Sequence, residues 1–490
     1  MLKAIVRPRW SRFESIPHPV STLPPPTSKR HPFYTYVRRR LIRLLTAIVF
    51  TCVLGVFLLR SYIWQESAPL VLLPPDRDET LPPNYHDWYE KEKSLPQHDI
   101  SLPYPQGSEG HYLWIANHAT GVGWGNVMQE ALLNAHLAYL SRRIYVFDSY
   151  TWNADTEYSD YNGHLIPSRI PLTALVSGPM AGAAFVEPET HPPAVIPEFF
   201  HEVCRTKTVI DPSDMRIKLF DASAMTTISA WIDKLARVED RCVEIMPKTN
   251  SIFEFWIFGS SARMLDIWPS FSKSPILTQF AWSPLVISAV ESNRAVVHPS
   301  IIDTGNSTQD LRVPLPGLLA LHIRRGDFDE HCKHFARWSS RYNAFNEIPS
   351  LPDKFEPPEG GGAGENTPEN FEIYAKHCFP TIEQIVGRVA DVLKTPEGQN
   401  ISRVYVLTNG KRDWLDELKS KLGELKQWES VHTSRDLHLS WEQKFVAQAV
   451  DMLIAQRAEV YIGNGFSSLT SNVNVLRLSH GFKSETIRFW

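Results

Sequence analysis

The sequence predicts an α/β protein with two Rossmann-like, doubly wound domains that face each other across a cleft, preceded by a single N-terminal transmembrane helix. Three observations predict this fold class. Apolar strand-like runs alternate with helical segments through the second half and, more loosely, from residue 111 to 149. An uncharged run lies near the N-terminus, and 490 residues exceed what one hydrophobic core usually holds.

The composition is that of an ordinary globular protein. Hydrophobic residues make up 43% of the chain and charged residues 21%, and the formal net charge is -4. A nucleic-acid-binding protein usually has a net positive charge, which this chain lacks. We therefore expect no nucleic-acid partner.

The first 64 residues predict a membrane anchor. Residues 1–43 form a basic tail rich in Pro and Ser, and the run "LLTAIVFTCVLGVFLL", Leu44 to Leu59, carries no charge. Tyr62, Ile63 and Trp64 extend this run, so residues 44–64 are expected to span the membrane as a signal anchor, because a cleaved signal peptide has a shorter basic region and a small-residue cleavage site. The charge asymmetry predicts a cytoplasmic tail and a lumenal catalytic part, and the short span suits the endoplasmic reticulum or Golgi.

Beyond the anchor, composition divides the chain into a stem and two domains. Residues 65–107 are acidic and Pro-rich with no sustained apolar period, which is typical of a stem. The globular pattern begins at "HYLWIANH", residue 111. We expect an N-terminal domain on the acceptor side over residues 108–310 and a C-terminal nucleotide-binding domain over residues 311–490.

Cysteines and glycosylation sequons agree with a lumenal location. Cys52 lies in the predicted span, and the remaining four permit two disulfides in three connectivities: Cys204, Cys242, Cys332 and Cys378. Two sequons occur, at Asn306 and Asn400, and both are expected in loops. Together these features favour an oxidising compartment.

In each predicted domain the apolar pattern predicts a series of strands and helices. In the first, we expect strands over 111–117 and 143–149 around a helix over 126–142. In the second, we expect strands at 317–323, 403–409 and 459–463, and helical segments over 371–394, 413–426 and 441–457. Ligands of such sheets bind where strands end and helices begin, and chemistry-bearing residues stand at three of those places.

The first such place is the glycine-rich stretch "HATGVGWGN", His118 to Asn126. Glycines allow backbone N–H groups to approach an anion, and the following helix presents its positive end. No Gly-Lys-Ser or Gly-Lys-Thr follows, so this is not a Walker loop. A simple tight turn between strand and helix is the alternative.

The second is "GLLALHIRRGDF", in which a buried strand ends in His322, Arg324, Arg325 and Asp327. A guanidinium at a strand end suits bidentate binding of phosphate. Alternation along the strand places Arg324 on the side of His322 and Arg325 on the other side. One arginine is thus expected to meet the ligand and its neighbour to form an internal salt bridge.

The third is "YIGNGFSSLTSNV", Tyr461 to Val473, where paired hydroxyls follow a strand and a Gly-Asn-Gly turn. Ser467, Ser468 and the helix start offer a phosphate-binding geometry. The alternative is that one serine only caps the helix.

Taken together, "HIRRGDF" and "VDMLIAQRAEVYIGNGFSSLTSNVNVLR" resemble the GDP-fucose protein O-fucosyltransferase family, and the early glycine-rich loop is similar to that family's first motif. The resemblance implies a GT-B glycosyltransferase that transfers fucose from GDP-fucose to a protein or glycan acceptor, inverting and independent of metal. It makes Arg324 the catalytic, diphosphate-binding residue. Further substrate-binding residues implied in this way are Asn126, His322, Asp327, Asp451, Glu459, Ser467, Ser468 and Leu469.

In this resemblance Asp451 and Glu459 lie near the guanine, although relatives carry Asp where this chain has Glu459. The catalytic base stays open, because the glycine-rich loop holds no acid; Glu130, one turn into the next helix, is a weak candidate. No metal or other cofactor is expected.

Two alternatives to this function remain open. Asp327-Phe328-Asp329 is formally the D-x-D of metal-dependent sugar transferases, although it is more simply the end of the arginine motif. A catalytically inactive, membrane-tethered nucleotide- or glycan-binding protein is the second alternative. Residues 339–372 form an insertion that is either a gate for the acceptor or a disordered loop.

Overall fold

The computed structural model describes residues 80–186, 191–259, 261–297, 311–359 and 367–490. The predicted anchor at 44–64, most of the predicted stem and the sequon at Asn306 lie outside the described residues. Within the described ranges, no helix is long and apolar enough to cross a membrane. The described residues all belong to one compact unit.

The second half of the chain forms a parallel sheet in the order β13-β12-β11-β14-β15. Its strands are β11 (Leu315–Ile323), β12 (Arg403–Thr408), β13 (Ser430–Thr433), β14 (Ala458–Gly463) and β15 (Ile487–Phe489). Numbered along the chain, this order reads 3-2-1-4-5, which is the doubly wound pattern with its switch point between β11 and β14. The predicted parallel sheet is confirmed.

The two faces of this sheet are covered by different helices because side chains alternate along each strand. Leu319, Leu321 and Ile323 pack under α16 (Ile382–Leu393) and α17 (Arg412–Leu425) in one hydrophobic cluster. Leu318 and Ala320 belong to the main core, toward α19 (Ala447–Arg457) and α20 (Ser468–Ser479). His322 is therefore on the α20 face.

Two predicted helical segments are each divided. Residues 371–394 form α15 (Pro368–Cys378) and α16, because Pro380 lacks an N–H and Thr381 begins a new helix with a capping box to Gln384. Residues 441–457 form α18 (Trp441–Phe445) and α19, separated at Val446.

The first half holds a parallel sheet in the order β2-β1-β9-β8. Its strands are β1 (Tyr112–Ile115), β2 (Ile144–Val146), β8 (Thr208–Ile210) and β9 (Cys242–Ile245). Between β1 and β2 the chain forms the glycine-rich loop and α3 (Trp124–Leu140), a largely buried helix, as the sequence predicts.

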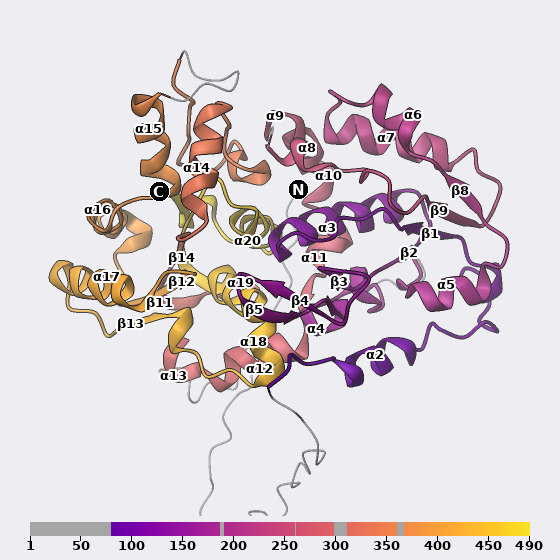
Figure 1. Cartoon of the computed structure of the whole chain (residues 1–490), viewed down its shortest axis with the longest axis horizontal. Coiled ribbons are helices and arrows are strands. Elements are labelled where there is room, and N and C mark those ends of the chain that lie inside the picture. The colour runs from indigo at the N-terminus through magenta and orange to yellow at the C-terminus, as the bar shows by residue number, and fades with distance from the viewer. Residues whose placement is uncertain (1–79, 187–190, 260, 298–310, 360–366) are drawn as a thin grey trace, which may run out of the picture. The chain divides into compact units, whose positions relative to one another are not determined.

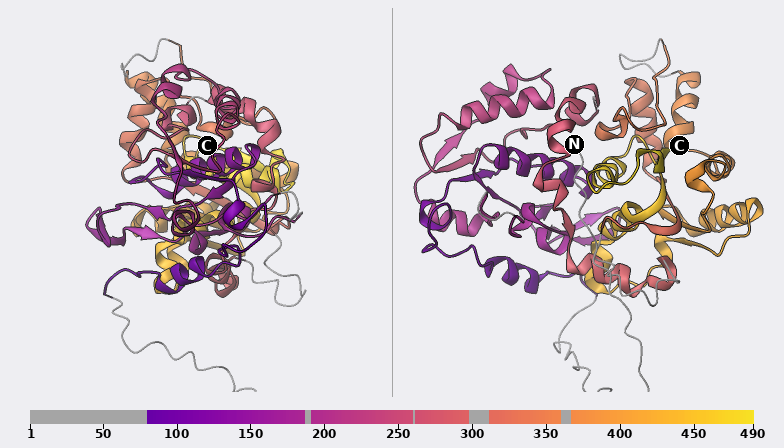
Figure 2. Two further views of the ribbon diagram at one scale, coloured as in Figure 1. Left: turned by 90° about the vertical axis from the view of Figure 1, so that its right-hand side faces the viewer. Right: turned by 180° about the vertical axis from the view of Figure 1, so that it is seen from behind.

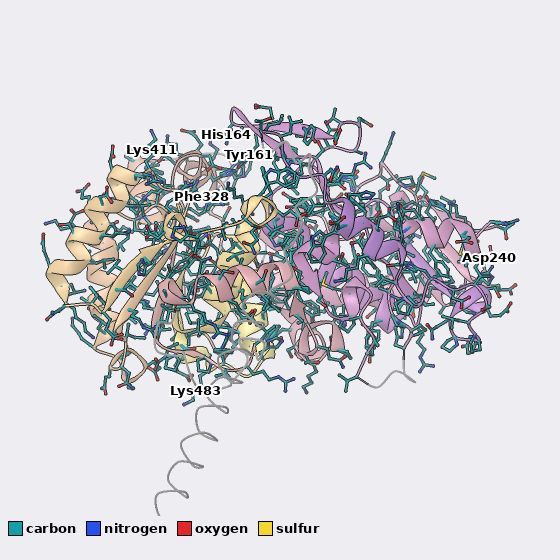
Figure 3. The ribbon with its side chains drawn as sticks, turned by 90° about the horizontal axis from the view of Figure 1, so that it is seen from below. Tyr161, His164, Asp240, Phe328, Lys411 and Lys483 are labelled. Carbon is teal, nitrogen blue, oxygen red and sulfur yellow. A yellow bond between two sulfur atoms is a disulfide. The ribbon has the colours of Figure 1, made fainter. Side chains whose placement is uncertain are left out.

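Shorter elements complete the first half. Three antiparallel pairs are β3 (Tyr150–Thr151) with β6 (Arg169–Ile170), β4 (Tyr158–Tyr161) with β5 (His164–Pro167), and β7 (Val176–Ser177) with β10 (Ala281–Trp282). The helices that follow are α4 (Leu172–Leu175), α5 (Pro197–Val203), α6 (Ser213–Lys218), α7 (Ala224–Leu235), α8 (Phe255–Gly259), α9 (Ser261–Met264), α10 (Trp268–Phe271), α11 (Pro275–Thr278), α12 (Pro284–Ser292) and α13 (Arg294–Val297). Figure 3 labels Tyr161 and His164 on the β4–β5 hairpin, which projects at one margin of that view.

The prediction that the stem extends to residue 107 is wrong. Residues 80–107 contain α2 (His86–Lys93) and pack on the body: the Gln97 amide donates to the carbonyls of Gly182 at 2.9 Å and Ala194 at 2.7 Å. The Tyr85 hydroxyl donates to the Glu442 carbonyl at 2.8 Å. Scattered anchoring side chains produce no apolar period, which is why the composition of this segment resembles a linker.

The two sheets lie side by side, with α3 next to α20 where they meet (Figures 1 and 2). The Trp282 indole donates to the Gln456 amide oxygen at 2.7 Å, and the Asn472 amide donates to the Gly125 carbonyl at 2.8 Å. The predicted boundary at residue 310 falls in residues outside those described and stays a prediction.

The structure selects one of the three disulfide connectivities. Cys204 pairs with Cys242, and Cys332 pairs with Cys378, so the first bond ties α5 to β9 and the second ties α14 (Phe328–Arg337) to α15. Each bond therefore lies within one half. Asn400 is exposed in the loop before β12, in agreement with the predicted placement of its sequon.

The described part of the 339–372 insertion is packed rather than loose. Tyr342, Phe345 and Phe355 are at most 3% exposed, and the turn at Ala344–Glu347 lies against α20. The Asn346 amide donates to the carbonyls of Gly465 at 2.8 Å and Ser467 at 3.2 Å. This segment thus holds the loop that begins α20.

Candidate active site

The carboxyl ends of β11 and β14 form the switch point of the second sheet, where ligands of doubly wound folds bind. After β11 the chain continues into Arg324, and after β14, which ends at Gly463, it turns through Asn464 and Gly465 toward α20. Since β11 and β14 are neighbours, the predicted arginine and serine motifs are brought to one edge of the sheet.

His322 is a buried, neutral support of this edge. Its side chain is 3% exposed, and its Nδ1 lies 2.8 Å from Thr470 Oγ1 on α20. Burial and the positive charge of Arg324 lower the pKa of His322 to about 3. The imidazole therefore stays uncharged at neutral pH and joins β11 to α20.

Arg324 offers an unsatisfied donor. Its side chain is 29% exposed, its guanidinium carbon lies 4.6 Å from the ring centre of Phe328, and its Nη2 donates to Asp327 at 3.3 Å. Its Nε is buried, and no acceptor within the described residues binds it. A guanidinium with a free N–H at a switch point is suited to a phosphate oxygen.

Arg325 points to the other side of the strand, as the alternation predicts, but it forms no salt bridge with any described residue. Its guanidinium lies over Phe379 at 4.5 Å and Trp414 at 4.1 Å, and its Nη2 donates to the Pro380 carbonyl. The side chain is 7% exposed, and burial lowers its pKa to about 10. Aromatic faces take the place of the expected carboxylate, because Trp414 and Phe379 lie beside the strand end.

The N-terminus of α20 presents free hydroxyls and N–H groups. Ser467 is the N-cap residue, yet its side chain makes no capping bond to the described helix, which removes the simple capping interpretation. Ser468 and Leu469, in the first turn, are partly exposed. A helix N-terminus that keeps its first N–H groups open is a binding site for anions.

The N-terminus of α3 meets that of α20. A Cβ on Gly125 would lie 2.8 Å from Ser468 Oγ and 2.9 Å from the Leu469 nitrogen, so only glycine permits this approach. Asn126, the next residue, is exposed. Two helix N-termini from different sheets thus converge beside the end of β11, as the combined sequence motifs predict.

Residues 262–480, which run from α9 into the end of α20, match the sequence profile of the GDP-fucose protein O-fucosyltransferases. This part of the chain is thus similar to the GDP-fucose protein O-fucosyltransferase family. The predicted resemblance is confirmed. No match to this sequence is found among curated proteins.

Several solved structures of fucosyltransferases are similar in part. POFUT1 in complex with GDP-fucose matches in one crystal form with 14% identity and a TM-score of 0.46 over 77% of this chain and 97% of that one. A second crystal form gives 13% identity and a TM-score of 0.46 over 79% and 99%. Arabidopsis thaliana FUT1 with GDP gives 10% identity and a TM-score of 0.34 over 80% and 73%. At such scores these likenesses carry no weight for the fold or function of this chain.

Asp327 and Asp451 both make internal contacts near the carboxyl ends of the strands, and their predicted contacts with the substrate stay a prediction. Asp327 precedes α14 and accepts from Arg324 and, at 3.3 Å, from the Asn409 amide. Asp451 on α19 accepts from the Ser434 hydroxyl at 2.8 Å, just beyond the carboxyl end of β13, and from Tyr405 at 2.7 Å. Burial raises the pKa of Asp451 to about 6.

The predicted role of Glu459 in guanine binding is wrong for this structure. Glu459 stands at the beginning of β14 and its carboxylate accepts from the Gly317 N–H, at the opposite edge of the sheet from Arg324. Seven residues of extended strand separate Gly317 from Arg324, which is about 23 Å. Glu459 is close in sequence to the serine motif, which suggested that it lies near the site. The extended strand β14 nevertheless places its first residues at the opposite edge of the sheet from its last ones.

The weak assignment of Glu130 as a base is also wrong. Glu130 is 2% exposed, and its Oε2 accepts the Ala119 N–H at 2.6 Å, so the carboxylate fixes the glycine-rich loop from beneath. Burial raises its pKa. A carboxylate enclosed in this way does not reach an acceptor hydroxyl, and the base stays open.

The D-x-D pair is divided between different partners. Asp327 turns toward Arg324, whereas Asp329 lies 2.8 Å from Lys333 Nζ. No group of metal-ligating side chains occurs within the described ranges.

Three polar residues that the sequence analysis missed position the site. Asn409 forms two hydrogen bonds with the backbone of Arg325. Its Oδ1 accepts from the Arg325 N–H at 2.8 Å, and its Nδ2 donates to the Arg325 carbonyl at 2.9 Å. Asn472 joins α20 to Gly125, and the Trp490 indole donates to the His322 carbonyl at 2.9 Å. Asn409 follows a predicted strand, which is the signal that would have indicated it; Asn472 and Trp490 act over long range and left no local signal.

Proposed function

We propose that this protein is a fucosyltransferase that transfers fucose from GDP-fucose to a hydroxyl of a protein or glycan acceptor, with inversion and without a metal. The observation that carries the proposal is the meeting of two helix N-termini at Gly125, next to the strand that ends in Arg324. The family match over residues 262–480 supports GDP-fucose as the donor.

The proposed reaction needs groups that stabilise negative charge, and the carboxyl edge of the second sheet supplies them. The bond between fucose C1 and the β-phosphate oxygen breaks, the acceptor oxygen bonds to C1, and the acceptor proton leaves to a base or to the phosphate. Negative charge develops on GDP as the sugar becomes cationic. Arg324 and the N–H groups of α20 and α3 stabilise that charge more strongly in the transition state than in the ground state.

The proposal includes the location. A span at 44–64 would anchor the enzyme in the endoplasmic reticulum or Golgi membrane, with the described part in the lumen. The basic tail, the two disulfides and the exposed sequon at Asn400 support it.

The test is calorimetric binding of GDP, GDP-fucose, GDP-mannose and UDP-glucose to the full-length protein in detergent with EDTA, together with release of GDP from GDP-fucose. A fragment that begins at residue 108 would lack α2 and is unsuitable. We expect GDP and GDP-fucose to bind, and Arg324→Ala to lower the rate of GDP release about a hundredfold. Arg412→Ala, at an exposed arginine of α17, is the matched control and should keep wild-type values.

Each outcome assigns the function. Absence of guanine-nucleotide binding by folded wild-type protein overturns the proposal. Binding of UDP-glucose that requires a divalent ion points to the metal-dependent alternative. GDP binding without release of GDP from GDP-fucose, with acceptor proteins present, identifies a binding protein.

A further inference from the structure

A cavity of about 560 Å³ lies at the carboxyl edge of the first sheet, outside the switch point. Its walls come from α2, from the segment after β2 and from the start of α5, three places that the fold brings together (Figure 1). The volume is in the range of natural ligand sites.

The cavity is rich in carboxylates. Five line it: Glu92, Asp148, Asp155, Glu157 and Glu198. Lys93 Nζ pairs with Glu90 at 2.7 Å, whereas Arg169 Nη2 donates to the neutral Ala154 carbonyl at 2.6 Å and keeps its positive charge. Five carboxylates thus face two cations in the lining. The lining therefore has excess negative charge.

Glu92 is the buried member of this set, at 5% exposure. Its Oε1 accepts from the Thr173 N–H at 3.0 Å and hydroxyl at 2.9 Å, while no donor among the described residues binds its Oε2. Burial raises the pKa of Glu92 to about 7, and the charges of Glu198 and Asp148 add to the rise. Glu92 Oε2 is not one of the buried atoms that lack a partner, so it keeps some accessible surface, and a cation bound in the cavity would favour the charged form of this carboxyl.

The cavity adjoins the glycine-rich loop. The Thr151 carbonyl, in a cavity wall, accepts the Gly121 N–H at 3.1 Å, and Asp148, also in the wall, lies 3.4 Å from His118. One strand, about 5 Å wide, thus separates the cavity from the loop that leads to α3. An occupant of the cavity would place neighbouring groups near the proposed donor site.

We propose that this cavity binds a lysine or arginine side chain of a polypeptide acceptor, close to the residue that receives fucose. The inference rests on the proposed function and names its acceptor class. A neutral glycan would satisfy hydrogen bonds but would not offset the surplus of carboxylates, so the charge favours a basic polypeptide.

The experiment measures fluorescence anisotropy of two fluorescein-labelled peptides with full-length protein in detergent at saturating GDP. One peptide has threonine flanked by lysines, and its twin has glutamines in their place. We expect the lysine peptide to bind about tenfold more tightly to the wild type at low salt. Glu92→Gln combined with Glu198→Gln should remove this preference.

The matched control is Asp416→Asn with Glu417→Gln, which removes the same charge from the exposed face of α17. It should keep the tenfold preference. Thermal unfolding and GDP binding of each variant show that it is folded.

Equal binding of the two peptides to the wild type, or a preference that survives Glu92→Gln with Glu198→Gln, overturns the inference. Binding of neutral chitotriose that those substitutions weaken assigns the cavity to a glycan instead and also overturns it. GDP binding distinguishes failure of this inference from failure of the proposed function. If it holds while lysine preference is absent, the donor proposal stands without this inference; if GDP does not bind, the donor proposal fails whatever the peptides do.

Discussion

At the scale of single residues, Arg324 and Arg325 show how adjacent, identical side chains acquire different roles. Strand alternation sends Arg325 between Phe379 and Trp414, where it is 7% exposed, and leaves Arg324 at the sheet edge with an unsatisfied Nε. Arg325 is therefore a structural cation, whereas Arg324 is available to a ligand. His322 supports both from within the sheet.

His322→Gln should reduce the sensitivity of the fold to acid. Because the folded pKa is about 3 and the unfolded value is about 6.5, the unfolded state binds more protons between these pH values, and stability falls as pH falls. Between pH 7 and pH 5 the wild type should lose up to about 2 kcal/mol more than the variant. Urea unfolding at several pH values measures this difference.

Thr470→Val is the control for the lost hydrogen bond, since it removes the partner of His322 without removing the titrating group. Its destabilisation should stay similar across pH. Parallel stability curves for wild type and His322→Gln would contradict the prediction.

At the scale of elements, the site depends on the approach of α3 and α20. The described residues of the 339–359 segment hold the loop before α20 through Asn346, and Asn472 holds Gly125. These side chains hold the loop before α20 and the first turn of α3 in place. The junction is therefore a packed contact and not a gap that a ligand alone bridges.

Gly125→Ala should separate the two helix N-termini. Its Cβ would lie 2.8 Å from Ser468 Oγ, so we expect a loss of about 1–3 kcal/mol of stability and about tenfold weaker GDP binding. Calorimetry with GDP and thermal unfolding measure the two effects.

Gly387→Ala is the matched control, because Gly387 lies in α16 and a Cβ there meets no atom of the described chain within 4 Å. It should leave GDP binding unchanged and stabilise the protein by roughly 0.5–1 kcal/mol. Unchanged GDP affinity in Gly125→Ala would show that the junction does not shape the site.

At the scale of the described unit, each half carries its own disulfide, and the contacts between halves are noncovalent. Cys204–Cys242 closes a separation of 38 residues and Cys332–Cys378 one of 46. The segment 80–107 adds to this unit because Glu92 of α2 bonds to Thr173 of the first half and Tyr85 bonds to Glu442 of the second.

Removing either disulfide should destabilise the protein by about 4 kcal/mol. A bond that closes a loop of this length lowers the entropy of the unfolded chain, and its removal returns that entropy to the unfolded state. The changes are Cys204→Ser with Cys242→Ser, and Cys332→Ser with Cys378→Ser, each leaving no unpaired partner. Denaturant unfolding with and without dithiothreitol measures the loss. If both paired variants unfold like the wild type, the bonds do not contribute to stability.

The sequence by itself determined the strands and helices that border the site and the sheet edge where the predicted motifs lie. Apolar periodicity predicted β11, β12, β14 and α3, and the predicted arginine and serine motifs meet at one switch point because parallel strands end at the same edge. These features depend on neighbours within a few residues, so a local pattern records them.

Only the tertiary structure decided which distant groups meet. It paired the cysteines, placed Glu459 at the far edge of the sheet, enclosed Arg325 between two rings and packed residues 80–107 on the body. It also gathered the cavity carboxylates from separate segments. Such contacts follow from strand register and side-chain packing over long sequence distances, where no local pattern carries the information.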